Sequence, residues 1–489
     1  VESYALDFWE RVTSVTNLEG QTLSLSYLIA GLVAEAQRFD GTTVTNIYSG
    51  VGRPPVLVET RYPDSINRFS YYKNDILGSA VNEACTVSNI VDFADRVTEV
   101  RVSPGSLPPW SIQYGYYSAG QVSNVVTLAG TNVCRYDAAE RLTNLVFASP
   151  RVGAPLSFGF GYETNAGLLS TMACANSGIA AQLGYDDLDR LTNLVWQTAG
   201  GAVLRRFSYR YNAVGMITNL TTEDGTSVDY AYDDLDQLPR ERRVNPTQTV
   251  YDIAYGYDEV GNRVSKSPAG IAVSYTYSNG CNRLTGWTAT STNAFAAIRY
   301  VDALGGASEL IGTNPAFGQL WGSNQTAATP GVAGTNFWVN GMALALGAQG
   351  LVAAVDDLAG NVTVITNTFT VAVTTNGQYL YNAAGCVTGI QYQGAGYQES
   401  IGLTWDGQYQ LTAVATNPAG GGQAVERYGY DALGNRLWTW TAESGTNWHV
   451  HAGANLAADL NSTGALVRSY VYGMGVDNLL AMTTYGAAT

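Results

Sequence analysis

A short phrase returns along this chain, and no other feature restricts its fold as strongly. Its clearest copy is YDDLDRLTNLVW at 185–196, and further copies begin at Tyr136, Tyr211, Tyr232, Tyr257 and Tyr430. The tyrosines that open successive copies are roughly 20–26 residues apart, which leaves room for two strands and two turns. Repetition of this kind indicates an architecture in which each unit buries its apolar face against the next unit.

The middle of the phrase has the chemistry of a tight turn. Its Asp, such as Asp186, is expected to accept a hydrogen bond from the backbone two residues on. Gly at the fourth corner allows a left-handed conformation, which Asp also tolerates better than most residues. Glu140 fits this corner less well. Gly or Asp fills the corner in other copies, at Gly215, Gly261, Gly385, Gly434, Asp189 and Asp236.

The flanks of the turn are predicted strands. A Tyr-x-Tyr pair such as Tyr209 and Tyr211 precedes the turn, and side chains two apart share one face of a strand. Apolar and polar residues alternate after it, as in LTNLVF at 142–147. Each phrase is therefore a predicted β-hairpin, and stacked hairpins should align Tyr over Tyr in a continuous aromatic seam. The residues that define the repeat are Tyr136, Asp137, Tyr185, Asp186, Tyr211, Tyr232, Asp233, Tyr257, Asp258, Gly261, Tyr381, Gly385, Tyr430, Asp431 and Gly434.

The composition favours an all-β chain whose sheet hides its own edges. The chain has 54 Gly and 32 Tyr, and only 13% of its residues are charged. Gly with Tyr and Thr is typical of strands and turns. Lysine, which often blunts exposed sheet edges, occurs only at Lys73 and Lys266. We therefore expect a long sheet that curls and closes.

Charge and targeting signals limit the partners. A net charge of −15 disfavours nucleic acid and anionic membranes, because phosphate recognition needs basic patches. The opening residues VESYALDFWERV lack the charged start and apolar stretch expected of a signal peptide, and the sequence has no apolar run long enough to span a bilayer. Because the chain begins with Val and not Met, we expect it to be mature or cut out of a longer protein, and the lack of an obvious terminal cap favours truncation. We interpret the arginines that follow the turns as solvated flanks: Arg141, Arg190, Arg263, Arg283 and Arg436.

No cofactor or metal is predicted. The five cysteines are an odd number without CxxC spacing, so they indicate neither a disulfide framework nor a zinc site. The Asp-rich turns at 186–189 and 233–236 lack the further ligands of a calcium loop, and we favour turn chemistry over calcium. His449 and His451 could be two ligands on one strand face, but an ordinary strand pair is the interpretation we favour.

Little in the sequence supports an enzyme. The chain has two histidines and no GxSxG or HExxH motif, and turn formation accounts for the many acids. Paired carboxylates for glycoside cleavage stay an open alternative. The aromatic residues could stack on sugars, with Trp321 and Trp338 as candidates, although packing between repeats is the interpretation we favour.

The copies are distributed unevenly along the chain. Residues 1–110 hold degenerate β repeats, and residues 111–300 carry the clearest copies. The phrase fades over 301–370, which predicts an irregular β segment or a small insertion. Copies resume over 371–489, where we expect the repeat region to stop short of its natural end.

The repeated phrase resembles the YD repeats of the Rhs (rearrangement hotspot) family. The best copies are YDEVGNR at 257–263 and YDALGNR at 430–436, and the resemblance covers residues 110–485. SYVYGMGVDNLLAM at 469–482 looks like the stretch shortly before the conserved C-terminal core of that family. The aspartates of that self-cleaving core would lie beyond Thr489, so the resemblance assigns no catalytic residue to this chain.

The resemblance implies a long antiparallel β-ribbon that spirals into a hollow shell. Such shells enclose a polypeptide, often a C-terminal toxin, in bacterial polymorphic toxins and insecticidal toxin-complex subunits, and the teneurins share the shell. We therefore expect a non-enzymatic bacterial protein, secreted or at the cell surface, that encloses and delivers a polypeptide encoded beyond this chain. The alternative is a secreted or cell-surface protein that binds carbohydrate or mediates adhesion.

Overall fold

A computed structural model describes most of the chain and shows only strands, turns and loops. The described residues are 3–17, 19–49, 55–151, 153–268, 271–278, 282–291, the strands between 298 and 371, 374–394, 397–418, 422–473 and 478–485. Within these ranges, no helix has the length and apolar character needed to cross a membrane.

The strands are short and follow one another closely. The first third comprises β1 Ser3–Leu6, β2 Val12–Thr16, β3 Thr22–Tyr27, β4 Val33–Gln37, β5 Thr43–Tyr48, β6 Leu57–Arg61, β7 Ile66–Tyr71, β8 Leu77–Val81, β9 Cys85–Val91, β10 Val97–Pro104, β11 Trp110–Tyr116, β12 Val122–Thr127, β13 Gly130–Tyr136 and β14 Leu142–Ala148. The middle comprises β15 Leu156–Tyr162, β16 Leu169–Cys174, β17 Ile179–Tyr185, β18 Leu191–Thr198, β19 Val203–Tyr211, β20 Ile217–Thr222, β21 Ser227–Ala231, β22 Arg240–Val244, β23 Thr249–Tyr257, β24 Arg263–Ser267, β25 Ile271–Tyr277 and β26 Leu284–Ser291.

The remaining strands fall into two groups. Between 298 and 371 lie β27 Ile298–Val301, β28 Ala307–Leu310, β29 Leu320–Gly322, β30 Ala327–Ala328, β31 Gly331–Ala333, β32 Asn336–Trp338, β33 Gly347–Asp356 and β34 Val362–Val371. The last group comprises β35 Thr374–Tyr381, β36 Val387–Gly394, β37 Tyr397–Trp405, β38 Leu411–Asn417, β39 Ala424–Tyr430, β40 Arg436–Thr441, β41 Gly445–Ala452, β42 Asn455–Leu460, β43 Leu466–Tyr472 and β44 Leu479–Thr484.

One continuous meander contains 36 of these strands. Each strand pairs antiparallel with the next one along the chain, as β17 does with β18 and β18 with β19. β26 pairs directly with β35, so the sheet continues across the intervening segment. Strands β27 to β34 form small sheets of their own, of which β33 and β34 make the longest pair. The prediction of an all-β chain of antiparallel hairpins is confirmed.

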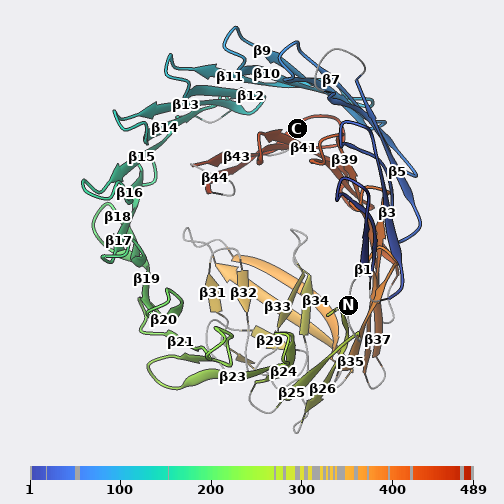
Figure 1. The fold of residues 1–489 in the computed structure, drawn as a ribbon. Helices are drawn as coiled ribbons and strands as arrows, with labels where there is room; N and C mark the ends of the chain where they lie inside the picture. The colour runs from blue at the N-terminus through green and yellow to red at the C-terminus, as the bar shows by residue number, and fades with distance from the viewer. Residues whose placement is uncertain are drawn as a thin grey trace.

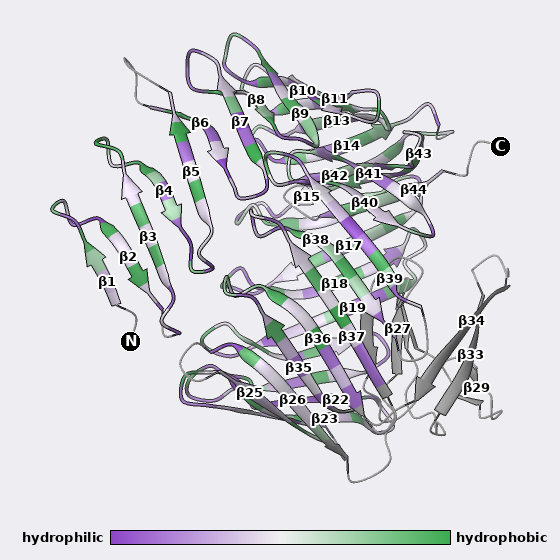
Figure 2. Ribbon diagram, turned by 90° about the vertical axis from the view of Figure 1, so that its right-hand side faces the viewer, coloured by the Kyte–Doolittle hydropathy of each residue, from purple (hydrophilic) through white to green (hydrophobic). Residues whose placement is uncertain are grey.

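The meander bends into a ring and then overlaps itself. Figure 1 shows β1 to β26 following a nearly circular path, after which β35 to β44 return past the N-terminal strands. The side view in Figure 2 shows β36 to β38 beside the row of β1 to β5. We call β1–β26 the first coil and β35–β44 the second coil. Among the described strands β1 pairs only with β2 and β44 only with β43, so the sheet is a spiral with two ends.

The main hydrophobic core lies between the two coils. Ile112 of the first coil and Val450 of the second are fully buried in it. The indole rings of Trp110 and Trp448 meet edge to face, with centroids 6.3 Å apart. In Figure 1 the strands β41, β43 and β44 lie inside the curve of β9 to β13, so this core joins the inner coil to the outer one. The overlap of the coils therefore buries apolar surface that a single curved sheet would leave in water.

Candidate functional site

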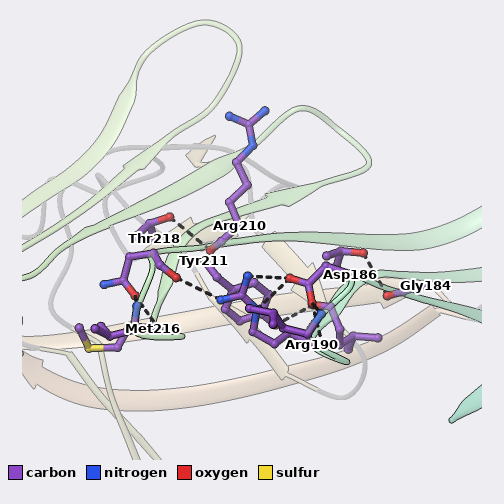
Figure 3. Close-up of polar contacts among 12 residues, drawn as sticks. Gly184, Asp186, Arg190, Arg210, Tyr211, Met216 and Thr218 are labelled. Carbon is purple, nitrogen blue, oxygen red and sulfur yellow. Dashed lines mark hydrogen bonds and ion pairs between the residues drawn. The ribbon is translucent and has the colours of Figure 1, made fainter. Parts of the chain in front are cut away.

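Each repeated turn is closed by its aspartate. The Asp186 side chain accepts backbone N–H bonds from Leu188 and Arg190, both 3.0 Å long (Figure 3). Asp189 at the fourth corner has φ 60° and Gly215 in the next repeat has φ 91°, as the turn chemistry predicts. Glu140 adopts φ 62° at the same corner despite its less suitable side chain. Turn formation thus accounts for the acidic clusters that could have suggested calcium, and the Asp233 carboxylate likewise binds two backbone N–H groups.

An arginine after the turn links one repeat to the next. The Arg190 guanidinium donates from Nε to Asp186 Oδ2 at 2.8 Å and from Nη1 to the Asn212 carbonyl at 3.1 Å. It also lies 4.7 Å from the centre of the Tyr211 ring (Figure 3). The Arg190 hydrogen bond holds the pKa of Asp186 below its usual range. The same Asp–Arg pair stacked on the next tyrosine recurs at Arg11, Arg96 and Arg141.

These contacts correct the interpretation of Arg141, Arg190 and Arg283 as solvated flanks, whereas Arg263 and Arg436 are exposed as predicted. Arg141 and Arg190 pair with their aspartates and face the following tyrosine ring. Arg283 binds Glu19, which lies 264 positions away in the same first coil, at 3.1 Å, and Arg263 and Arg436 stack on Tyr255 and Tyr428. Spacing along the chain could not show the contacts of Arg141 and Arg190, because the ring that receives each of these guanidinium groups belongs to the next repeat.

The predicted contact of tyrosine on tyrosine occurs at Tyr117 and Tyr136, whose ring centroids are 6.1 Å apart, but the repeat tyrosines recur in a different contact. Equivalent strands of successive repeats are two strands apart, or about 9.5 Å, whereas interacting rings lie roughly 4.5–7 Å apart. Many of the repeat tyrosines donate their hydroxyl to a carbonyl of the preceding repeat, as Tyr211 does to Leu191 at 2.6 Å. The same bond is made by Tyr27, Tyr48, Tyr116, Tyr162, Tyr185, Tyr232, Tyr257, Tyr277, Tyr381 and Tyr430. Burial raises the pKa of Tyr185 and Tyr232.

The repeat-defining residues lie along one edge of the ribbon. Because each strand pairs with the next, successive turns alternate between the two edges of the ribbon. We call the turns that contain the repeated phrase the motif turns, and we call the edge on which they lie the motif rim. The turns between them, such as 198–202, are the return turns on the return rim. Gly261, Gly385 and Gly434 occupy the fourth corner of their motif turns with φ 86–89°. Tyr136 ends β13, and burial raises its pKa to about 12.

Motif turns of the second coil pack against return turns of the first coil. The Asn67 amide donates to the Ala432 carbonyl at 3.2 Å, and the Asn82 amide donates to the Tyr430 carbonyl at 3.0 Å. Side-chain amides of the first coil thus donate hydrogen bonds to backbone carbonyls at this motif turn of the second coil. We call this contact between motif turns 406–409 and 431–434 and return turns 38–41, 62–65 and 82–85 the coil seam.

Arg38 is the cation at the centre of one part of the coil seam. It donates to the Gly407 carbonyl, and its guanidinium lies 4.3 Å from the centre of the Tyr409 ring. The Asp64 carboxylate accepts the Gly407 N–H at 2.8 Å, and the Tyr409 hydroxyl donates to Asp40 at 3.3 Å. A ribbon edge with no backbone partner is thus held by side chains from more than 300 residues away.

A polar ladder crosses four strands of the second coil. Asp459 Oδ1 lies 2.8 Å from His449 Nδ1, the Thr439 hydroxyl lies 2.8 Å from His449 Nε2, and the Tyr470 hydroxyl donates to Asp459 Oδ2 at 2.6 Å. The neighbours of His449 in sequence, Trp448 and Val450, face the core between the coils. The ladder therefore occupies the opposite face, which is turned toward the inside of the ring.

Two opposing effects act on the carboxylate of this ladder. Burial works to raise the pKa of Asp459, and the hydrogen bonds from His449 and Tyr470 outweigh it, so the pKa lies below its usual range. His451 bonds the Arg436 carbonyl at 3.0 Å, so the two histidines serve different partners. Burial lowers the pKa of His451. The spacing of the histidines did not predict this ladder, because its other members come from neighbouring strands.

The cysteines and two of the tryptophans singled out in the sequence lie outside the contacts described above or outside the described residues. Cys85, Cys134, Cys174 and Cys386 are free thiols, and Cys281 lies outside the described residues. The side chains of Trp321 and Trp338 also lie outside what the structure describes. In the described ranges, no group of three acidic, histidine or cysteine residues is arranged to hold a metal ion.

Comparisons with known proteins found structural likenesses alone. No protein-family model and no curated protein matches the chain. A crystal structure of TcdB2-TccC3-TEV is similar with a TM-score of 0.45 and 12% identity, over 96% of this chain and 30% of that chain. The Photorhabdus luminescens Tc holotoxin pore has a TM-score of 0.49 and 11% identity over the same shares. A porin-like protein from Bacteroides uniformis covers 46% of this chain and 91% of that one, with a TM-score of 0.19 and 12% identity. The chain thus spans about 30% of the length of the toxin-complex chains.

Proposed function

We propose that this chain is a wall segment of a hollow β-shell that encloses and delivers a polypeptide, without catalytic activity of its own. The observation that carries the proposal is the single meander of 36 strands, which bends through a ring and overlaps itself. A ribbon built to fill its own interior would bring apolar side chains together at the centre. The main core of this chain instead lies between the overlapping coils.

The contacts between repeats suit a wall. The Asp186–Arg190–Tyr211 arrangement and its equivalents connect each hairpin to the next, so the curvature is fixed repeat by repeat. Such a ribbon needs no central packing to hold its shape, because each repeat contacts its neighbours. The resemblance of the repeated phrase to the Rhs family supports the same function.

The inner face of the second coil suits a polypeptide better than an apolar ligand. Its polar ladder, with His449, Asp459 and Tyr470, places polar side chains that bond one another on the face opposite the apolar core. The interior of a shell should also be far larger than a ligand pocket of roughly 300–1,000 Å³. We propose an extension of the same protein as the enclosed polypeptide, because β44, the last strand described, lies inside the ring.

Carbohydrate binding is the less favoured function. Sugar stacking needs exposed aromatic faces, whereas Trp110 and Trp448 are buried between the coils. Many repeat tyrosines are occupied by a guanidinium or a carbonyl, as Tyr211 is. We further propose a bacterial protein that is secreted or at the cell surface, which fractionation of a producing strain would test.

The test is a protease-protection experiment. A flexible polypeptide with a single protease site would be appended after Thr489, and its cleavage rate compared with that of the free polypeptide. Enclosure predicts cleavage at least tenfold slower, because the protease must wait for the shell to open. Equal rates for the appended and free polypeptides would contradict the proposal.

A matched control separates enclosure from simple steric hindrance. The double variant Asn67→Ala with Asn82→Ala removes the hydrogen bonds from the first coil to the Ala432 and Tyr430 carbonyls. If the overlapping coils protect the polypeptide, this variant should cleave faster than the parent. Slow cleavage that does not change in the variant would point to hindrance by the attachment point alone.

A further inference from the structure

The motif rim of the first coil carries a row of exposed apolar side chains. Leu188, Val214, Leu235 and Val260 occupy equivalent positions in four consecutive motif turns and are 67–75% exposed. Neighbouring motif turns are two strands apart, so the row places an apolar group about every 9.5 Å. Contiguous exposed apolar surface of this kind marks an interaction site more often than it marks chance.

The molecule itself shows what covers a motif turn. In the second coil the turn 431–434 packs against return turns of the first coil, where Asp431 and Ala432 are only 5% and 6% exposed and Leu433, the position equivalent to Leu188, is 46% exposed, against 67–75% for the four side chains of the row. Asn67 and Asn82 supply the donors that bind its carbonyls. A motif rim is therefore a surface that a return rim recognises.

The return rim on the same arc has the complementary chemistry. Val203 and Leu204 are 41% and 43% exposed at the start of β19, and the exposed Arg205 and Arg206 follow them. The exposed acids of the motif rim over these turns are Asp187, Asp189, Asp233, Asp234, Asp236 and Glu259. One rim thus presents apolar groups with acids, and the other presents apolar groups with Arg206, while Arg205 pairs with Glu223 of the neighbouring return turn.

We propose that the motif rim over turns 186–189 to 258–261 binds the return rim around 198–206 of a second copy of this chain. In this contact a motif rim packs against a return rim of another molecule, as it does within one molecule at the coil seam. Because the two rims are different surfaces, each copy keeps one free rim and further copies can add. Opposite charges on the two rims make the association weaken as salt rises.

Sedimentation velocity of the full chain over a wide concentration range tests this inference. The sedimentation coefficient should rise with concentration and continue past the dimer. A motif-rim variant, Leu188→Ser with Leu235→Ser, should stay monomeric, and so should a return-rim variant, Leu204→Ser with Arg206→Glu. An equimolar mixture of the two variants should form a dimer and nothing larger, because each supplies the rim that the other lacks.

A variant away from both rims serves as the control. Met482→Ser changes a side chain that is 52% exposed on β44, away from both rims, and should associate like the parent. Circular dichroism should show that all variants keep the β signal. A parent chain that stays monomeric at every concentration would overturn the proposal. A mixture of rim variants that remains monomeric, or a parent that stops at a dimer, would overturn the head-to-tail arrangement.

Discussion

Trp448→Ala should detach the second coil from the first while leaving the rest of the ribbon paired. Trp448 is 7% exposed, and its ring meets Trp110 of the first coil edge to face. Replacing a buried tryptophan with alanine costs about 3–5 kcal/mol, because the lost transfer energy adds to the energy of the cavity. The lost pairing of the two rings accounts for roughly 0.5–1.5 kcal/mol of this cost.

The cost should appear locally rather than across the whole molecule. Repeat arrays behave as a chain of neighbouring units, so a defect at one contact lowers the stability of the units that share it. Hydrogen exchange followed by mass spectrometry would report the opening free energy of each strand. Amides of β41 to β43 should lose about 3–5 kcal/mol of protection, whereas amides of β19 to β23 should change by less than about 0.5 kcal/mol.

A second tryptophan provides the matched control. Trp9 is 71% exposed in the first motif turn, so Trp9→Ala should change the protection of β41 to β43 by less than about 0.5 kcal/mol. The reasoning would be refuted if Trp448→Ala weakened all strands equally, or if β41 to β43 kept their parental protection.

Three further changes test the repeat, the polar ladder and the tight packing of the sheet. Tyr211→Phe removes the hydroxyl bonded to the Leu191 carbonyl and should lower the free energy of unfolding by about 1 kcal/mol in urea titrations. The pKa of Asp459 is lowered in the folded chain, so its contribution to stability is present above pH 3.8 and is lost as pH falls through its folded value. Asp459→Asn should therefore flatten the fall in stability between about pH 5 and pH 2, measured by chemical denaturation at each pH. Gly429→Ala would place a Cβ 2.2 Å from the Trp438 indole and should lower the melting temperature, at a cost of about 1–3 kcal/mol.

The repeated turn could be predicted from sequence because its determinants are local. Asp186 bonds backbone groups two and four residues away, and Gly215 adopts the φ value that its position requires. Both facts depend on residues within one phrase. The all-β class followed from the same local signals, since hairpins of this length must pair with something to be stable.

Contacts between repeats were predicted less well, because the sequence does not give their geometry. The tyrosines were expected to stack on one another, but the separation of equivalent strands leaves space that Arg190 and its equivalents fill. In the sequence, the position of Arg190 directly after its turn is also the position expected of a solvent-exposed arginine. Only the folded sheet shows that the Tyr211 ring lies beneath it.

The coil seam lies beyond sequence reasoning of this kind. Asn67 and Ala432 are 365 positions apart, and neither belongs to a recognisable motif for that contact. The position of the seam depends on the accumulated curvature of some two dozen strands. Small differences in twist between neighbouring strands, summed over the first coil, decide which return turn meets which motif turn.

Small-angle X-ray scattering of the full chain tests the central claim most directly, because it measures whether the protein has mass at its centre. A compact, filled chain of 489 residues would have a radius of gyration of about 23 Å and a single symmetric distance distribution. A spiral wall around an interior predicts a clearly larger radius, with the distance distribution shifted toward long distances. A monomer with the radius and profile of the filled globule would contradict the account.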